Sequence, residues 1–122
     1  MDAVIKQALE QDRTIDITTV GRKTGQSQRI EIWFHNLEGE LYITGLPRRC
    51  HWYANFLSHP NFTFHLKETT QADLPARATP VLDPDERRRV ITQIQTKLGR
   101  TGSDIEARVA GSPLVKVELI IE

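Results

Sequence analysis

The residues in this sequence best suited to chemistry are two pairs of cations in glycine-containing stretches. The first pair, Arg22 and Lys23, lies in the stretch VGRKTGQSQR and is followed by the hydroxyl residue Thr24. The flanking Gly21 and Gly25 allow a tight turn whose backbone N–H groups, together with basic side chains, can hold an anion. The stretch therefore indicates one of two things, an anion-binding turn or an ordinary solvated hairpin.

The second pair, Arg48 and Arg49, lies in the stretch GLPRRCHW directly before a predicted helix. Unpaired backbone N–H groups and the helix dipole make a helix N-terminus a favourable place for a phosphate. Three aromatic residues, Trp33, Trp52 and Tyr53, lie near these stretches in the sequence. Two cationic loops with neighbouring rings would suit a flat heteroaromatic ligand that carries a phosphate tail.

No other motif in the sequence indicates a catalytic side chain or a metal. A phosphate-loop lysine motif, a GxGxxG fingerprint, an HExxH pair and a nucleophile elbow are all missing. Cys50 and His51 are adjacent, but neighbours on a helix point about 100° apart, so they do not form a catalytic pair. The histidines, which have no metal-ligand spacing, are His35, His51, His59 and His65. We therefore expect no metal site and assign no catalytic residue.

The composition is typical of a soluble globular protein and argues against several classes. The chain has 122 residues, 39% hydrophobic and 26% charged, so we expect one domain over residues 1–122. Its 16 basic residues balance 16 acidic ones, whereas nucleic-acid binders normally carry a basic excess. No apolar run approaches the roughly 18 residues of a membrane span. The first residues are too polar for a signal peptide, and Cys50 is the single cysteine. We expect a cytoplasmic protein without nucleic-acid or membrane partners.

Alternation of apolar and polar residues predicts the sheet that positions these loops. Strands are expected over residues 14–20, 29–35, 41–44, 62–66, about 76–82, and 114–121. In the second of these, Ile30 and Phe34 share one face, while Arg29 and His35 share the other. Short turns between the first three strands predict an antiparallel meander.

Helical spacing predicts the remaining elements. The apolar residues of CHWYANFLSHP fall on one face of a short helix that ends before Pro60. Asp83 opens a capping box, and the apolar stripe that follows ends at Gly99. Shorter helices are expected near the N-terminus and over residues 103–110. The sum is mainly β (α+β): about six antiparallel strands and two to four short helices forming a small barrel.

Three ordered blocks of the sequence resemble the deazaflavin-dependent nitroreductase family. They are TTVGRKTGQSQRIEIWF, LYITG and HWYANFLSHPNFTFHLK, and together they cover residues 14–67. The resemblance implies a six-stranded split β-barrel related to flavin reductases and pyridoxamine-phosphate oxidases. It also implies an oxidoreductase that binds the deazaflavin coenzyme F-420 and passes its hydride to nitro-aromatics, quinones or other small electrophiles.

The resemblance further implies which residues bind the coenzyme. Carried over position by position, they are Arg22, Lys23, Thr24 and either Gln28 or Arg29 at the phosphate-bearing tail, Thr44, Gly45, Arg48 and Arg49 along the ring, and Trp52, Tyr53 and Asn55 in the wall. The coenzyme supplies the hydride chemistry, which explains why no catalytic dyad is needed.

Two other functions remain open on the same fold. The first is an FMN-dependent reductase. The second is a non-catalytic carrier of a flavin or haem, with His35, His51 or His65 as an axial ligand. The last strand is apolar on both faces near Ile120, which favours a homodimer that buries an exposed sheet edge.

Overall fold

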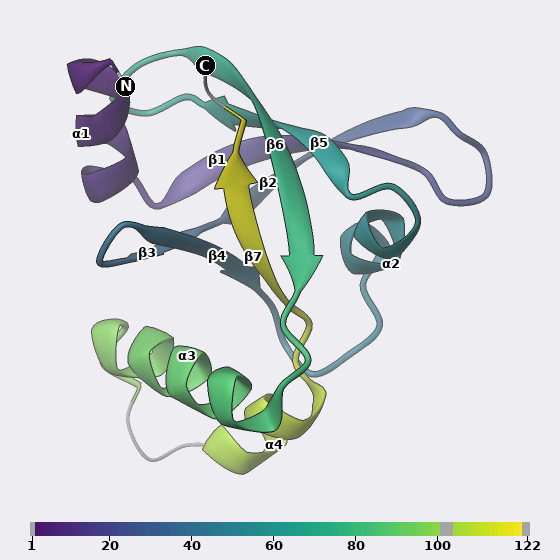
Figure 1. Ribbon diagram of the computed structural model, residues 1–122, viewed down its shortest axis with the longest axis vertical. Coiled ribbons are helices and arrows are strands. Elements are labelled where there is room, and N and C mark those ends of the chain that lie inside the picture. Colours follow the sequence, from purple (N-terminus) through teal and green to yellow (C-terminus); the bar gives the residue numbers. More distant parts are fainter. Residues whose placement is uncertain (1, 101–103, 121–122) are drawn as a thin grey trace.

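The computed structural model describes residues 2–100 and 104–120, which form a curled antiparallel sheet of seven strands with four helices around it (Figure 1). This α+β split barrel confirms the predicted fold class. The helices are α1 (Ala3–Gln11), α2 (His51–Ser58), α3 (Pro84–Lys97) and α4 (Ile105–Gly111). The strands are β1 (Thr14–Val20), β2 (Ser27–Trp33), β3 (His35–Leu37), β4 (Glu40–Thr44), β5 (Asn61–Leu66), β6 (Ala72–Pro80) and β7 (Leu114–Leu119).

A one-residue connection closes the barrel. The strand order is β2-β1-β5-β6-β7-β4-β3, so β2 and β3 form opposite edges of the sheet. These two strands are nevertheless consecutive in the chain, with Phe34 alone between them. Because one residue spans only about 3.3 Å in a strand, the two edges must lie next to each other, and the sheet must curl.

This closure explains why the described sheet has seven strands where six were expected. The predicted strand 29–35 is interrupted at Phe34, whose backbone N–H donates to the carbonyl of Arg13 at 3.0 Å. Because of this interruption, His35 does not share the face of Arg29, as was expected. It is buried and pairs with Tyr42 of β4. The expected strand 76–82 begins earlier, at Ala72, because that residue pairs with Leu66 of β5.

Two apolar clusters lie on opposite faces of this sheet. The inner cluster fills the barrel and includes Ile15, Ile17 and Phe64, with Ala8 of α1 and Phe56 of α2 covering its openings. The second cluster packs α3 against the outer face of β4 and β7; its buried members are Tyr42, Val81, Val90, Ile91, Ile94 and Leu114. The outer face of β2, β1 and β5 has no helix over it in Figure 1.

Arg87 of α3 bonds to three backbone carbonyls in the segments that surround this helix. Its Nε donates to the carbonyl of Val109 at 2.9 Å, Nη1 to Val81 at 3.0 Å, and Nη2 to Ser112 at 2.6 Å. Three backbone carbonyls are thus satisfied by one partly buried guanidinium.

We predict that Arg87→Ala lowers the free energy of unfolding by about 3 kcal/mol, because charge-assisted bonds are lost and carbonyls are left unpaired. Urea denaturation would measure this. The matched control is Arg88→Ala, whose exposed ion pair with Glu106 should contribute much less to the free energy of unfolding. Equal losses for the two variants would contradict the assignment.

His35 makes stability depend on pH. Burial, followed by the nearby cations Lys97, Arg100 and Arg13, lowers the pKa of His35 from 6.5 to about 4. The folded state therefore keeps the imidazole neutral where the unfolded chain binds a proton. Its contribution to stability is complete above pH 6.5 and is lost as the pH falls toward 4.

We predict that the protein loses about 2 kcal/mol of stability between pH 7 and pH 5 through His35. Denaturation at both pH values should show this loss in the unmodified protein and in the exposed-site control His51→Gln. It should be absent from His35→Phe, which cannot titrate. An unchanged pH dependence in His35→Phe would contradict the account.

Candidate functional site

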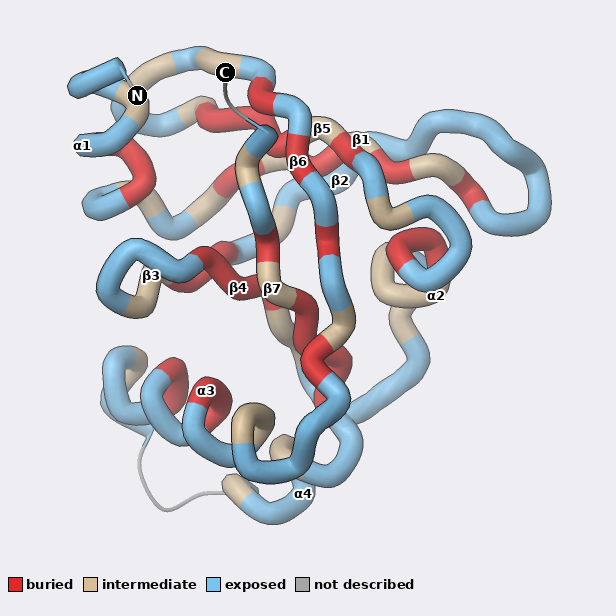
Figure 2. Tube along the Cα trace, in the orientation of Figure 1, coloured by how far each residue is buried: buried red, intermediate tan, exposed pale blue. Residues whose placement is uncertain are grey.

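The basic turn between β1 and β2 is built on internal backbone hydrogen bonds. The N–H of Gly21 donates to the carbonyl of Gln26 at 2.8 Å, and that of Gly25 donates to Gly21 at 2.9 Å. Gly25 has a φ of 71°, which favours glycine. Figure 2 shows this exposed hairpin extending beyond the rest of the barrel.

The turn therefore offers an anion fewer backbone N–H groups than expected. Those of Gly21, Gly25 and Gln26 are bonded within the turn, and that of Arg22 donates to the side chain of Asn55 at 3.2 Å. The expectation of a turn lined by free amides is wrong for these four groups, because they close the turn itself. The basic side chains of Arg22 and Lys23 remain exposed.

Asn55 fastens α2 to this hairpin. The residue is 4% exposed, and its Nδ2 donates to Thr19 Oγ1 at 3.0 Å and to Gln28 Oε1 at 3.3 Å. Together with the hydrogen bond that Asn55 Oδ1 accepts from the Arg22 N–H, these bonds link α2 to β1, to β2 and to the turn between them. Gln28 thus lies on the same side of the sheet as α2.

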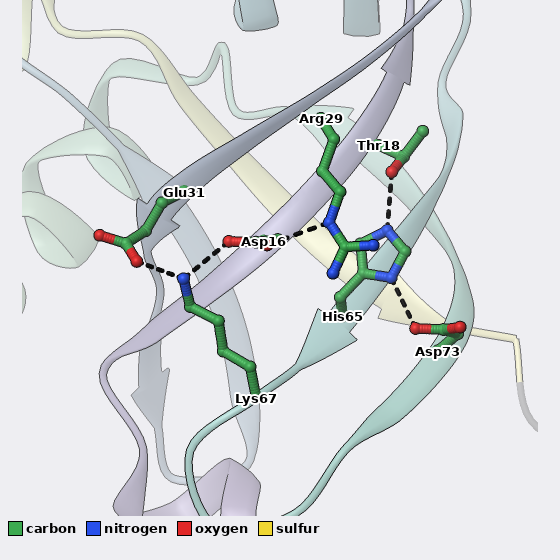
Figure 3. A network of polar contacts seen from close by, with 7 residues as sticks. All are labelled: Asp16, Thr18, Arg29, Glu31, His65, Lys67 and Asp73. Carbon is green, nitrogen blue, oxygen red and sulfur yellow. Dashed lines mark hydrogen bonds and ion pairs between the residues drawn. The ribbon is translucent and has the colours of Figure 1, made fainter.

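Arg29 lies on the other side. It pairs with Thr18 across the β1–β2 ladder, and its Nε donates to Asp16 at 3.0 Å (Figure 3). The hydrogen bond from Lys67, and after it that from Arg29, lowers the pKa of Asp16. Of the two alternatives for the tail-binding strand residue, the geometry places Gln28 beside α2 and Arg29 away from it.

The loop before α2 is anchored through Thr44 and Gly45. Thr44 Oγ1 donates to the carbonyl of Pro113 at 2.6 Å. A Cβ on Gly45 would lie 3.5 Å from Trp52 and 3.6 Å from Pro113, so the glycine packs between these rings. Both residues thus hold the loop against Pro113.

A cavity of about 440 Å³ lies beside this loop, against α2 and the end of α4. Arg48, Arg49 and Tyr53, three of the predicted site residues, line it together. The other lining residues are Cys50, Ala54, Leu57, Leu82, Arg87, Ala110, Gly111, Ser112 and Pro113. The cavity therefore combines cationic side chains with apolar and aromatic walls.

Two unsatisfied groups border the cavity. Ser112 is 3% exposed, and its Oγ has no hydrogen-bond partner among the described residues. At the start of α2, Cys50 provides no side-chain cap for the first backbone N–H groups. The Ser112 hydroxyl is itself buried and presents no surface to the cavity, whereas the uncapped start of α2 can donate to an anionic group.

The predicted site residues thus form two groups on different sides of α2. Arg22, Lys23, Thr24 and Gln28 belong to the hairpin held by Asn55. Arg48, Arg49 and Tyr53 belong to the cavity, with Thr44, Gly45 and Trp52 behind it.

Sequence reasoning missed the cavity residues that come from distant segments. Leu82 follows β6, while Ser112 and Pro113 precede β7. The stretch AGSP between the predicted helix and last strand was the single local signal, since a small-residue turn ending in proline marks a rigid bend.

Two features are absent from the described residues. Within residues 2–100 and 104–120, no group of three or more His, Cys, Asp or Glu side chains is placed to hold a metal ion. No helix in the described part of the chain has the length and apolarity to cross a bilayer.

Comparison with known proteins identifies a family. A family model described as F420H(2)-dependent quinone reductase matches residues 2–109, most of the chain. No curated protein matches the sequence.

Several solved structures share the fold at low sequence identity. A conserved hypothetical protein from Mycobacterium tuberculosis has a TM-score of 0.77 at 17% identity, covering 99% of this chain and 81% of that one. An F420 reductase has a TM-score of 0.65 at 18% identity, covering 95% and 93%. The heme storage protein HutZ from Vibrio cholerae has 0.70 at 18%, covering 97% and 89%. Likeness at this identity shows the fold alone.

We predict that Asn55→Ala frees the Arg22 amide, since the acceptor at 3.2 Å is removed. Hydrogen exchange followed by NMR should show the Arg22 amide exchanging about tenfold faster or more, because local opening no longer breaks this bond. The control Asn61→Ala, at the exposed start of β5, should leave the Arg22 rate unchanged. Unaltered exchange in Asn55→Ala would contradict the proposed link between α2 and the hairpin.

Proposed function

Because the chain belongs to the F420H(2)-dependent quinone reductase family, we propose that it transfers a hydride from reduced coenzyme F-420 to a small electrophilic acceptor. The observation that supports this most is the cavity of about 440 Å³ beside α2. It joins two arginines and a tyrosine in one partly apolar space.

The residues at this site fit such a coenzyme in their chemistry. A deazaflavin ring has a flat apolar surface, which corresponds to the apolar and aromatic walls of the cavity. Its tail is anionic, which corresponds to the exposed cations of the hairpin and the loop. The uncapped start of α2 adds backbone donors of the same sign.

Binding and orientation are the tasks of the protein in this proposal. Arg22 and Lys23 attract the tail, while Tyr53 and the loop from Thr44 to Arg49 hold the ring against the barrel. Leu57 and Leu82, 57% and 69% exposed, are positioned at the cavity to exclude water when a ligand covers them. The bound coenzyme supplies the hydride, so no side chain has to accept or donate it.

The lining of the cavity also restricts which class of electrophilic acceptor can bind. Hydride transfer requires the donor and acceptor atoms to approach within about 3–3.5 Å. Apolar residues such as Ala54, Leu57 and Pro113 line the remaining wall. A flat, weakly polar electrophile such as a quinone or a nitro-aromatic fits this wall better than a charged metabolite does.

The alternatives draw less support from the described residues. A haem carrier needs an axial ligand, but both ring nitrogens of His65 are hydrogen-bonded at 2.7 Å, and His35 is buried. An FMN-dependent reductase would use the same site, and purified protein that carries a yellow chromophore would favour it.

We predict that the protein quenches the fluorescence of coenzyme F-420 on binding. The double variants Arg22→Ala with Lys23→Ala, and Arg48→Ala with Arg49→Ala, should each weaken binding roughly 10- to 100-fold, since hydrogen bonds to charged groups contribute about 1.5–3 kcal/mol. The matched control, Arg88→Ala with Arg89→Ala on the exposed side of α3, removes the same charge and should bind normally.

Normal binding by both site variants would contradict the assignment. Turnover is tested separately by following oxidation of the reduced coenzyme after addition of a simple quinone. Tight binding without any turnover against quinones and nitro-aromatics would make the protein a carrier and not a reductase.

A further inference from the structure

A chain of three side chains crosses the open outer face of the sheet, away from α2. Thr18 Oγ1 lies 2.7 Å from His65 Nε2, and His65 Nδ1 lies 2.7 Å from Asp73 Oδ1 (Figure 3). The residues come from β1, β5 and β6, which are neighbours in the sheet. A hydroxyl, an imidazole and a carboxylate in this order is the arrangement that activates an alcohol nucleophile.

Burial and two hydrogen bonds hold the ring of His65 between Thr18 and Asp73. His65 is 6% exposed, so its ring is held in place. The hydrogen bond from His65 lowers the pKa of Asp73, which keeps that carboxylate ionised as an acceptor. In the tautomer that carries its proton on Nδ1 and donates it to Asp73, Nε2 accepts from the Thr18 hydroxyl and can take its proton.

We propose that Thr18 is an acyl acceptor, activated by His65 and oriented through Asp73, for small activated esters. Thr18 Oγ1 attacks the carbonyl carbon, and its proton passes to His65 Nε2. The bond from the carbonyl carbon to the leaving-group oxygen then breaks, and that oxygen takes the proton. The products are an acylated Thr18 and a free alcohol or phenol, with no change of oxidation state.

A recess of about 300 Å³ lies beside the Asp73 end of this chain of side chains and is lined by Arg29, Lys67, Asp73 and three further residues, with Thr18 and His65 outside its lining. Arg29 is the cross-strand partner of Thr18, so their side chains share the outer face within about 5 Å at Cβ. The Arg29 guanidinium, whose Nε donates to Asp16, also lines the recess and is a cation that can stabilise the negative charge developing on the carbonyl oxygen.

This site is separate from the coenzyme site. Thr19, the next residue, points to the inner face and accepts from Asn55. Successive side chains of a strand point to opposite faces. The inference therefore does not depend on the proposed reductase activity.

The test uses p-nitrophenyl acetate as the acyl donor. We expect one equivalent of p-nitrophenol to be released per chain in an initial burst, and mass spectrometry should locate one acetyl group on Thr18. Thr18→Val should abolish this acetylation, whereas Thr18→Ser should retain it. The matched control is Thr63→Val, since Thr63 faces Thr18 across the β1–β5 ladder with similar partial burial.

Asp73 acts through His65 and needs its own control. Asp73→Asn should slow the acetylation of Thr18 about tenfold or more, and Asp73→Glu should restore part of the rate. Acetylation confined to lysines, an unmodified Thr18, or an equal rate in Thr18→Val would overturn the proposal. In that case the three side chains would be a hydrogen-bonded support of the sheet.

Discussion

The single residue between β2 and β3 is the constraint on which the rest of the structure depends. Phe34 joins the two edge strands of a seven-stranded sheet, so the sheet has to close on itself. Closure gives the sheet an inner face that packs around the core and an outer face that α3 covers at β4 and β7 and that carries polar side chains at β1 and β5. It also brings the end of β4 beside the start of β7, where Thr44 bonds to Pro113. The loop and helix that follow β4 are then held against the barrel and can wall a site.

The two faces of β1 carry two different sets of polar contacts. On the inner face, Thr19 receives the amide of Asn55, and α2 with its cavity is fastened there. On the outer face, Asp16 and Thr18 belong to a polar network with Arg29, His65 and Lys67 (Figure 3). A strand alternates its side chains with a period of two. The proposed coenzyme site and the hydroxyl–imidazole pair can therefore involve residues that are adjacent in sequence and still be independent.

The local sequence pattern was sufficient to predict the helices, strands and turns, but not which of them contact one another. The glycine turn, the aromatic helix before Pro60 and the capping box at Asp83 are short-range signals, and each element appears where the sequence predicted it. The break at Phe34 was missed because its cause, closure of the sheet, is a long-range event. For the same reason the sequence could not separate Gln28 from Arg29, since the face of each depends on the register with β1. Ser112 and Leu82 reach the cavity only through tertiary packing.

The proposed function requires the hairpin and the cavity, on the two sides of α2, to hold the coenzyme together. A titration of ¹⁵N-labelled protein with coenzyme F-420, followed by NMR, tests this most directly. The predicted result is a set of amide shift changes confined to the hairpin around Arg22, the loop from Thr44 to Arg49, helix α2 and the segment at Ser112. Shift changes concentrated instead on the opposite side of the barrel, in the cavity of about 690 Å³ between Leu9 and Val117, would contradict it.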